Sequence, residues 1–446
     1  MSNNPDLLPQ SKNSTLVPII IIAGLFFIFG FVTWINGALI PFMKTINELT
    51  EAQSYLVATA SYISFVVMAL PASYIINKIG YKKGMSLGLI VMALGALIFI
   101  PAASARTYWM FLAAIFIQGA GMTLLQTASN PYITILGPLE SAAKRIAIMG
   151  IANKVAGALG SVIFGAILLS GIDDIKEKLT LVDTAKKESL LNTMADSVVT
   201  PYIAMAVVLF LLGILIRKAP LPHVEADPIE VSGTGEKTKT SIFHFPYLWL
   251  GVLALFLYVG VEVIAGDTII SYGISLDIPV EQAKFFTLFT LMAMVVTYAL
   301  GVFLIPKYIS QAFALKASAI LGITLSFCIA FTDGFTSVLF VASLGFANAL
   351  VWPAIWPLAL KGLGEFTKTA SALLIMAISG GAILPLLYGK LVDEKKEELI
   401  EAGIDSMTAT VDSASFGYWI LLPCYLVIFY YAFWGHKVGL KGAKKY

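Results

Sequence analysis

Twelve long apolar segments, separated by short breaks of Lys, Asp, Gly and Pro, limit how this chain can fold. Each segment is continuous and close to the roughly 20 residues that a membrane-spanning helix needs. Because backbone polar groups in lipid must be hydrogen-bonded within a segment, the runs predict helices, and they lack the alternation of β-barrel strands. The predicted spans cover residues 15–43, 53–77, 84–103, 107–136, 145–170, 198–217, 246–274, 283–306, 312–332, 335–361, 368–390 and 415–436.

The composition leaves little room for anything outside the membrane. The 446 residues are 58% hydrophobic and 13% charged, whereas charged residues make up about 25% of soluble proteins. Most enzymes and all nucleic-acid-binding modules are therefore excluded. The sequence contains no G-x-x-x-x-G-K-[ST] phosphate loop, and its three histidines lie at or beyond span ends. We expect neither an enzyme nor a bound cofactor, and both cysteines lie inside apolar runs, which predicts no disulfide framework.

The distribution of basic residues predicts an orientation. With the N-terminus in the cytoplasm, 18 Lys and Arg residues fall on the cytoplasmic side and 10 on the other. This agrees with the positive-inside rule. We therefore expect a multi-pass protein of a bacterial inner membrane, with both termini cytoplasmic.

The chain divides into two halves of six spans. A polar segment separates them, and we interpret it as a linker, with a regulatory or docking loop as the alternative. A polar break containing Pro131 recurs 222 residues later at Pro353. Such repeats are typical of transporters that bind substrate at the midplane between halves. The predicted units are 1–217, 218–244 and 245–446, and the outer segments 171–197 and 393–413 are expected to form short surface helices.

Three charged residues lie within predicted spans, where each costs roughly 2.5 to 3.5 kcal/mol on insertion scales. Tyr258 and Glu262 are four residues apart and share a helix face, and Gly266 could let the helix unwind and redirect Asp267. The alternatives are a structural ion pair between Lys154 and one acid, and a water-exposed helix end for Asp267. We predict that Lys154, Glu262 and Asp267 serve ion coupling, with a sodium site near the two acids as one interpretation.

Uncharged polar residues mark several of the same spans. Gln126 and Asn130 are four residues apart, as are Trp352 and Trp356. Amides both donate and accept hydrogen bonds, and indole faces pack on sugar rings, so the set suits a neutral polyol. Amides that join helices, and Trp at the membrane interface, are the alternatives. The predicted substrate-binding residues are Asn36, Gln126, Asn130, Asn153, Tyr258, Glu262, Asn348, Trp352 and Trp356.

Several motifs resemble those of the fucose/glucose/galactose permease branch of the major facilitator superfamily. They are Gly30-Phe31 to Asn36 with Leu39-Ile40-Pro41, the turn Asn77 to Gly84, Gln126 to Tyr132 with Leu136-Gly137-Pro138, and Tyr258 to Glu262. The resemblance covers essentially the whole chain. It implies twelve helices that rock about a central sugar site, which is lined by helices 1, 4, 7 and 10.

The chain departs from the proton-coupled fucose permeases at two positions. Gly37 and Gln126 replace the acids that those relatives carry on helices 1 and 4, and neither can titrate. Asn153 matches a sugar-contacting Asn, whereas Lys154 lies outside the pattern; Glu262 matches the glucose/galactose members, some of which are sodium coupled. The resemblance thus implies a monomeric importer of glucose or galactose with sodium or proton symport. Alternatives are an uncoupled facilitator, a carrier of fucose or N-acetylglucosamine, and a sugar sensor.

Overall fold

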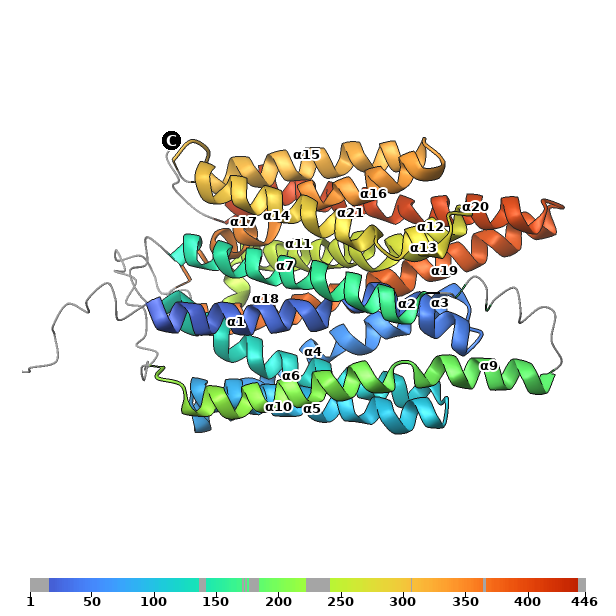
Figure 1. Ribbon diagram of the computed structural model, residues 1–446. Helices are drawn as coiled ribbons and strands as arrows, with labels where there is room; N and C mark the ends of the chain where they lie inside the picture. Colours follow the sequence, from blue (N-terminus) through green and yellow to red (C-terminus); the bar gives the residue numbers. More distant parts are fainter. Residues whose placement is uncertain are drawn as a thin grey trace, which may run out of the picture.

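The computed structural model describes residues 16–135, 142–170, 172, 175, 184–221, 241–305, 307–363 and 366–439. Every regular element in this part of the chain is helical (Figure 1). Within these described residues, twelve helices are long and apolar enough to cross a membrane. The predicted fold class, an all-α membrane protein with twelve spans in two halves, is therefore confirmed.

The N-terminal half packs its helices in two groups. Helix α5 lies against α6 and α10, and α1 lies against α7. The spans of this half are α1 (Leu16–Thr33) with α2 (Asn36–Ile46), α4 (Leu56–Ile79), α5 (Tyr81–Ser104), α6 (Tyr108–Ile135), α7 (Ala142–Leu168) and α10 (Val199–Lys218). The short α3 (Glu51–Ser54) precedes α4, and α9 (Thr184–Asp196) leads into α10.

The C-terminal half also consists of six spans that pack in groups. Helix α11 packs against α19 and α21, and α15 packs against α16. Its spans are α11 (Pro246–Val263) with η3 (Ile264–Thr268) and α12 (Ile269–Ser275), α14 (Phe286–Leu304), α15 (Gln311–Ala330), α16 (Gly334–Asn348) with α17 (Val351–Leu360), α18 (Thr367–Met376) with η5 (Ala377–Ser379) and α19 (Gly380–Glu401), and α20 (Ser406–Gly417) with η6 (Tyr418–Ile420) and α21 (Leu421–Phe433). The short elements are η2 (Ile242–His244), α13 (Val280–Ala283) and η7 (Gly435–Lys437).

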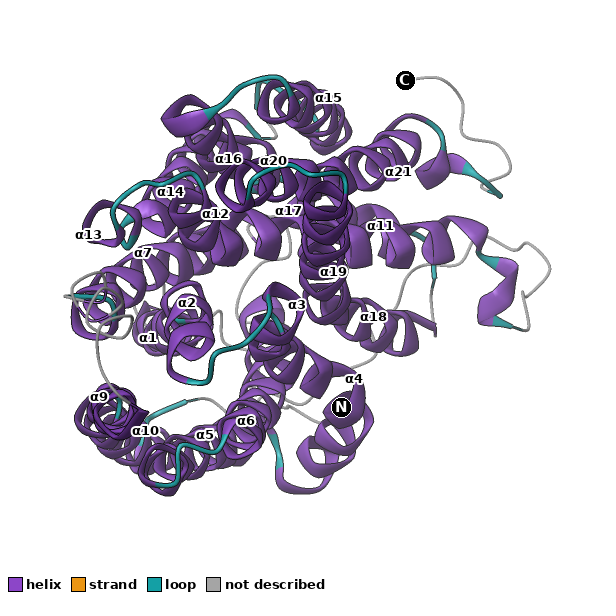
Figure 2. Cartoon of the chain, turned by 90° about the vertical axis from the view of Figure 1, so that its right-hand side faces the viewer, coloured by secondary structure: helices purple, strands orange, loops and turns teal. Residues whose placement is uncertain are grey.

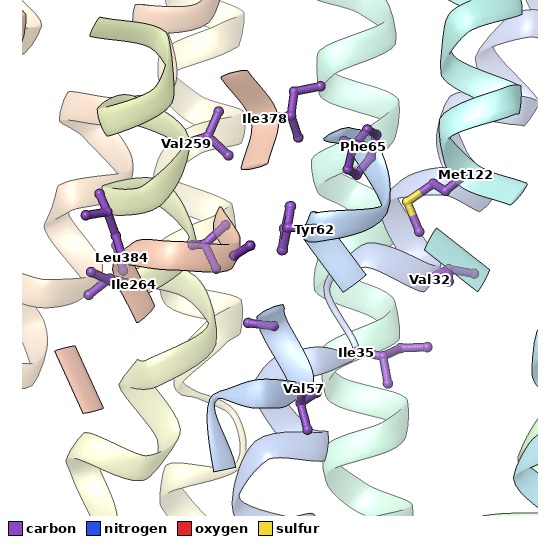
Figure 3. Packing of buried hydrophobic residues seen from close by; sticks show 14 of the residues in the cluster. Val32, Ile35, Val57, Tyr62, Phe65, Met122, Val259, Ile264, Ile378 and Leu384 are labelled. Carbon is purple, nitrogen blue, oxygen red and sulfur yellow. The ribbon is translucent and has the colours of Figure 1, made fainter. Parts of the chain in front are cut away.

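The halves meet along several helix pairs, of which two are the most extensive. Seen end-on, α5, α6 and α10 lie on one side of the bundle and α15, α16 and α21 on the other (Figure 2). Helix α7 packs against α14, and α4 packs against α19. Tyr62 and Phe65 of α4 belong to the same buried apolar cluster as Val259 and Leu384 from the other half (Figure 3). The core is therefore continuous across the boundary.

Spans 1, 7 and 10 are interrupted near their middles. Helix α1 ends at Thr33 before α2 begins at Asn36, and α16 ends at Asn348 before α17 begins at Val351. Span 7 passes through the π-helical segment Ile264–Thr268. A helix end or π-turn frees backbone polar groups from their regular partners. Each of these spans remains one helical stretch with an irregular turn, and irregular turns within membrane helices are common at the substrate and ion sites of transporters.

The expectation of short surface helices at 171–197 and 393–413 is only partly met, since α9 is a separate short helix whereas residues 393–401 continue α19. Together with the turns between them, α9 and α10 give a helical stretch over Lys186–Lys218, and α18, η5 and α19 give one over Thr369–Glu401, each 33 residues long. At 1.5 Å per residue each measures about 50 Å, more than the ~30 Å hydrocarbon layer, so the charged segments extend the spans instead of lying on the surface. Glu394 to Glu401 are good helix formers, and the first glycine after them is Gly403, at φ +86°. Most of 171–183, and linker residues 222–240, lie outside the described part.

Candidate functional site

A buried ion pair connects the two halves at the middle of the bundle. Lys154 on α7 places its Nζ 2.7 Å from Oε1 of Glu262, near the end of α11. The two side chains are only 8% and 11% exposed. The phenols of Tyr258 and Tyr298 also face Glu262, so Tyr258 shares the face predicted from its spacing. The structural ion pair considered as an alternative for Lys154 is present, and it crosses between the halves.

Trp34 occupies the break in span 1 and covers the lysine. The Lys154 Nζ lies 4.2 Å from the centroid of its ring, within range of a cation–π interaction. Two glycines make room for the indole: a Cβ at Gly157 would lie 2.3 Å from Cδ1 of Trp34, and a Cβ at Gly266 would lie 2.1 Å from Cζ3. Trp34 is thus fixed between α7 of one half and η3 of the other.

The π-turn in span 7 is stabilised by two threonines from α14. Thr287 donates its hydroxyl to the carbonyl of Gly266 at 2.7 Å, and Thr290 donates to that of Ala265 at 3.0 Å. These bonds satisfy carbonyl groups at the irregular turn. A π-turn brings residues five apart together, so Asp267 turns toward the face that carries Glu262. The local unwinding expected at Gly266 is therefore present.

Asp267 is completely buried at the junction of the broken spans. Its side chain is 0% exposed, and within the described part of the chain neither carboxyl oxygen makes a hydrogen bond of good geometry, the Asn36 amide being a weak partner. The alternative of a water-exposed helix end is therefore wrong, because α12 continues the span to Ser275. Lys154, Glu262 and Asn36 face the carboxyl. Gly37 lies directly opposite, since a Cβ there would be 3.7 Å from Cα of Asp267.

The amide residues predicted to bind substrate lie on helices around this junction. Asn36, Gln126 and Asn153 are buried, and Asn153 makes a long 3.4 Å hydrogen bond to the carbonyl of Phe26. Asn130 is half-buried on α6. Asn348 is fully buried, and its Oδ1 accepts a 2.7 Å hydrogen bond from Tyr425, so one side of this amide joins helices.

Trp352 and Trp356 form a stacked aromatic pair on α17. Their ring centroids are 5.3 Å apart, with the planes inclined by 23°, and both side chains are half-buried. The shared face predicted from the i, i+4 spacing is confirmed. Two partly accessible indoles one turn apart present an apolar, planar surface.

A second set of contacts joins the halves at the end of the bundle away from the termini, where α3 lies beside α19 (Figure 1). Asp393 of α19 accepts hydrogen bonds from the amides of Glu51 (3.1 Å) and Ala52 (2.8 Å). The rings of Tyr55 and Tyr388 meet edge to face with centroids 5.5 Å apart. We call Asp393, Tyr55 and Tyr388 the end latch, because these residues close this end of the protein.

Sequence reasoning noted Trp34 among the polar positions of span 1 without giving it a role, and did not single out Thr287, Thr290 or Asp393. Trp34, Thr287 and Thr290 stabilise the charged junction, and Asp393 closes the end latch. The spacing of Trp34 two residues before Asn36 was a usable signal, since a bulky indole beside a break points to packing. No sequence signal pairs Asp393 with α3, because that contact joins residues more than 300 positions apart.

Irregular membrane helices, two halves and a buried charge pair between them are typical of membrane carriers. The Major Facilitator Superfamily model matches residues 22–385, and the chain belongs to this family. A glucose/galactose transporter of Brucella abortus is 35% identical over 83% of this chain and 86% of its own length. An L-fucose-proton symporter of Escherichia coli is 29% identical over 86% and 88%.

A solved structure agrees with this assignment. The structure titled as the transporter FucP in the outward conformation superposes with a TM-score of 0.67 at 26% identity, covering 94% of this chain and 98% of its own. The chain therefore falls in the fucose/glucose/galactose permease branch that its motifs indicated. Its relatives are named as transporters rather than enzymes, and it is a multi-pass membrane protein.

Proposed function

We propose that the protein imports a neutral monosaccharide, glucose or galactose first among candidates, by cation-coupled symport with alternating access. The observation that carries the proposal is the buried Lys154–Glu262 pair, which connects the halves where spans 1 and 7 are broken. A glucose/galactose transporter at 35% identity supports the substrate class. The coupling ion is sodium or a proton, and the protein works as a monomer in the bacterial inner membrane with both termini cytoplasmic.

The sugar site lies between the halves and combines amides, an acid and stacked indoles. Hexose hydroxyls both donate and accept hydrogen bonds, which suits the amides and Glu262. The Trp352 and Trp356 rings offer an apolar face for the C–H side of a pyranose. In this proposal the sugar contacts are Asn36, Gln126, Asn130, Asn153, Tyr258, Glu262, Asn348, Trp352 and Trp356.

Coupling requires that sugar and cation favour the same conformational change. Lys154 and Glu262 come from different halves, so a group that alters their pairing alters the contact between halves. Asp267 lies beside both and completes the proposed coupling set. The transport experiment below can also give three other outcomes. The protein would then be an uncoupled facilitator, a carrier of fucose or N-acetylglucosamine, or a sugar sensor that does not transport.

Counterflow of radiolabelled glucose and galactose in proteoliposomes tests the carrier function without any ion gradient. We expect counterflow of at least one of the two sugars, inhibited by the unlabelled sugar. A sensor would bind without counterflow. Accumulation of sugar driven by an ion gradient then distinguishes a symporter from a facilitator. We expect Glu262→Gln to abolish this accumulation, whereas Glu397→Gln, at an exposed position of α19, should leave it intact. Accumulation that survives Glu262→Gln would overturn the role of Glu262 in coupling.

A further inference from the structure

Asp267 is a buried acid to which the described residues offer no positively charged partner of its own. It is 0% exposed, neither oxygen makes a hydrogen bond of good geometry within the described residues, and the Asn36 amide is its one weak hydrogen-bonding neighbour. The titratable groups that face it are Lys154 of α7, Glu262 of α11 and Tyr62 of α4. On its other sides, Asn36 of α2 and the threonines of α14 are uncharged. The Lys154 ammonium already bonds to Glu262 at 2.7 Å.

The charges of this cluster do not balance. One ammonium and two carboxylates leave a net charge of minus one in a site that is nearly closed to water. An uncompensated buried carboxylate is strongly unfavourable, whereas a neutral carboxyl costs far less. The cluster therefore needs one additional positive charge, and Asp267 is the acid that lacks one.

The surroundings favour a proton over a metal cation as that charge. Hard cations are held by several oxygen ligands at once. The carbonyls of Ala265 and Gly266 beside Asp267 already accept from Thr290 and Thr287. The Thr268 hydroxyl bonds both the carbonyl of Ile264 and the phenol of Tyr418. No group of three His, Cys, Asp or Glu side chains that could hold a metal occurs in the described residues.

We propose that Asp267 binds the coupling proton of this transporter, at the junction of the break in span 1 and the π-turn in span 7. The assignment rests on the symport proposed above and narrows its ion to a proton. A hydronium ion on one side transfers its proton to a carboxyl oxygen of Asp267, so that one O–H bond of hydronium breaks, one O–H bond forms on the carboxyl and water is left. On the other side the carboxyl O–H bond breaks and the proton returns to water.

Protonation of Asp267 changes the contact between halves through Lys154. With Asp267 neutral, the ammonium pairs with Glu262, as in this structure. Once Asp267 loses its proton, two carboxylates compete for one ammonium, which weakens the Lys154–Glu262 bridge. A proton thus stabilises one arrangement of the halves over another, which is the condition for coupling.

The test compares Asp267→Asn with Asp277→Asn in proteoliposomes, using labelled galactose and glucose. Asp277 lies ten residues further along in an exposed turn at φ +60°, a conformation that Asn tolerates well. We expect wild type and Asp277→Asn to accumulate sugar when the outside is acidic, and a protonophore to abolish this. Asp267→Asn should keep counterflow within about two-fold of wild type and lose at least ten-fold in pH-driven accumulation, since 1.4 kcal/mol of coupling corresponds to a factor of ten.

Each contrary result has a distinct meaning. Accumulation by Asp267→Asn under a pH gradient would overturn the role of Asp267. Wild-type accumulation driven by sodium and not by a pH gradient would overturn the proton assignment and leave symport standing. Absence of hexose counterflow in wild type would remove the proposed function itself. If Asp267→Asn does not yield folded protein, Asp267→Glu serves instead: it should keep accumulation with a shifted pH profile, and an unchanged profile would count against the proposal.

Discussion

Two aspartates lie where the halves of this protein meet, and the fold treats them differently. Asp393 in the end latch is half-buried and uses both oxygens to accept backbone hydrogen bonds. Asp267 in the central cluster is fully buried and, within the described residues, accepts no backbone hydrogen bond and has only the Asn36 amide as a weak partner. The carboxylate of the end latch is therefore stabilised by fixed backbone amides, whereas the carboxyl of Asp267 depends on a positive charge that binds and dissociates.

The two aspartates therefore have different roles: Asp393 stabilises one conformation, whereas Asp267 responds to a bound ion. Charge-assisted hydrogen bonds to fixed amides stabilise one arrangement of the halves. A buried acid without fixed partners responds to whatever supplies its missing charge. We therefore expect changes in the end latch to shift conformational populations, and changes in the central cluster to remove coupling.

The largest expected effect is on stability, from Lys154→Met. The substitution leaves Glu262 buried without its partner, and breaking a buried ion pair in this way costs about 3 to 5 kcal/mol. Thermal unfolding in detergent should show a large fall in melting temperature. The double variant Lys154→Met with Glu262→Gln should recover much of the loss. Lys395→Met, at an exposed i, i+3 pair with Glu398, is the matched control, and an equal fall there would contradict the account.

Gly266→Ala should have the next largest effect. The new Cβ would lie 2.1 Å from the Trp34 ring, so the indole must leave its place over Lys154. Overpacking of this kind costs about 1 to 3 kcal/mol. Trp fluorescence and melting temperature should both change, whereas Gly24→Ala, with open space around its Cβ position, should leave both unchanged. A wild-type melting temperature for Gly266→Ala would show that Trp34 is free to move.

Asp393→Ala should shift conformation more than stability. Losing hydrogen bonds to a charged group costs about 1.5 kcal/mol, or roughly a ten-fold change in population. Spin labels at Ser104 and Glu401, both exposed, should report a larger share of longer distances by double electron–electron resonance, in a background without Cys328 and Cys424. An unchanged distance distribution would mean that Asp393 does not hold this end closed.

The smallest effect concerns a third aspartate. Asp405 caps the N-terminus of α20, and hydrogen bonds from Thr408 and Met407 lower the pKa of this carboxyl from its ordinary value of 3.8. A lowered folded-state pKa contributes stability above the unfolded pKa and loses it as the pH falls through the folded value. The contribution of Asp405 should therefore be constant at neutral pH and fade only below about pH 3.8. A difference in stability between wild type and Asp405→Asn that grew between pH 5 and 8 would contradict this.

The fold was predictable because a bilayer permits few solutions. Long apolar runs must be helices, so span positions and the paired faces of Tyr258 with Glu262 and of Trp352 with Trp356 followed from spacing. The charged segment at 393–413 was misjudged, because composition does not say whether a helix continues straight out of the membrane or bends along its surface.

The candidate site was only partly predictable, because contacts between distant spans set its chemistry. The sequence identified Lys154, Glu262 and Asp267 as costly residues. It could not show that Lys154 forms its ion pair with Glu262 and not with Asp267. The pairing depends on the π-turn at Ile264–Thr268 and on where α7 crosses α11. The roles predicted for the sugar-binding amides stay predictions.

Sugar-driven proton movement tests the central claim most directly. Because coupling is reciprocal, an inward galactose or glucose gradient must carry protons into proteoliposomes that begin at equal pH, which a trapped pH-sensitive dye records. The account predicts internal acidification by wild type that is absent in Asp267→Asn, although labelled sugar still exchanges. Sugar entry through wild type with no proton movement, or acidification that persists in Asp267→Asn, would contradict it.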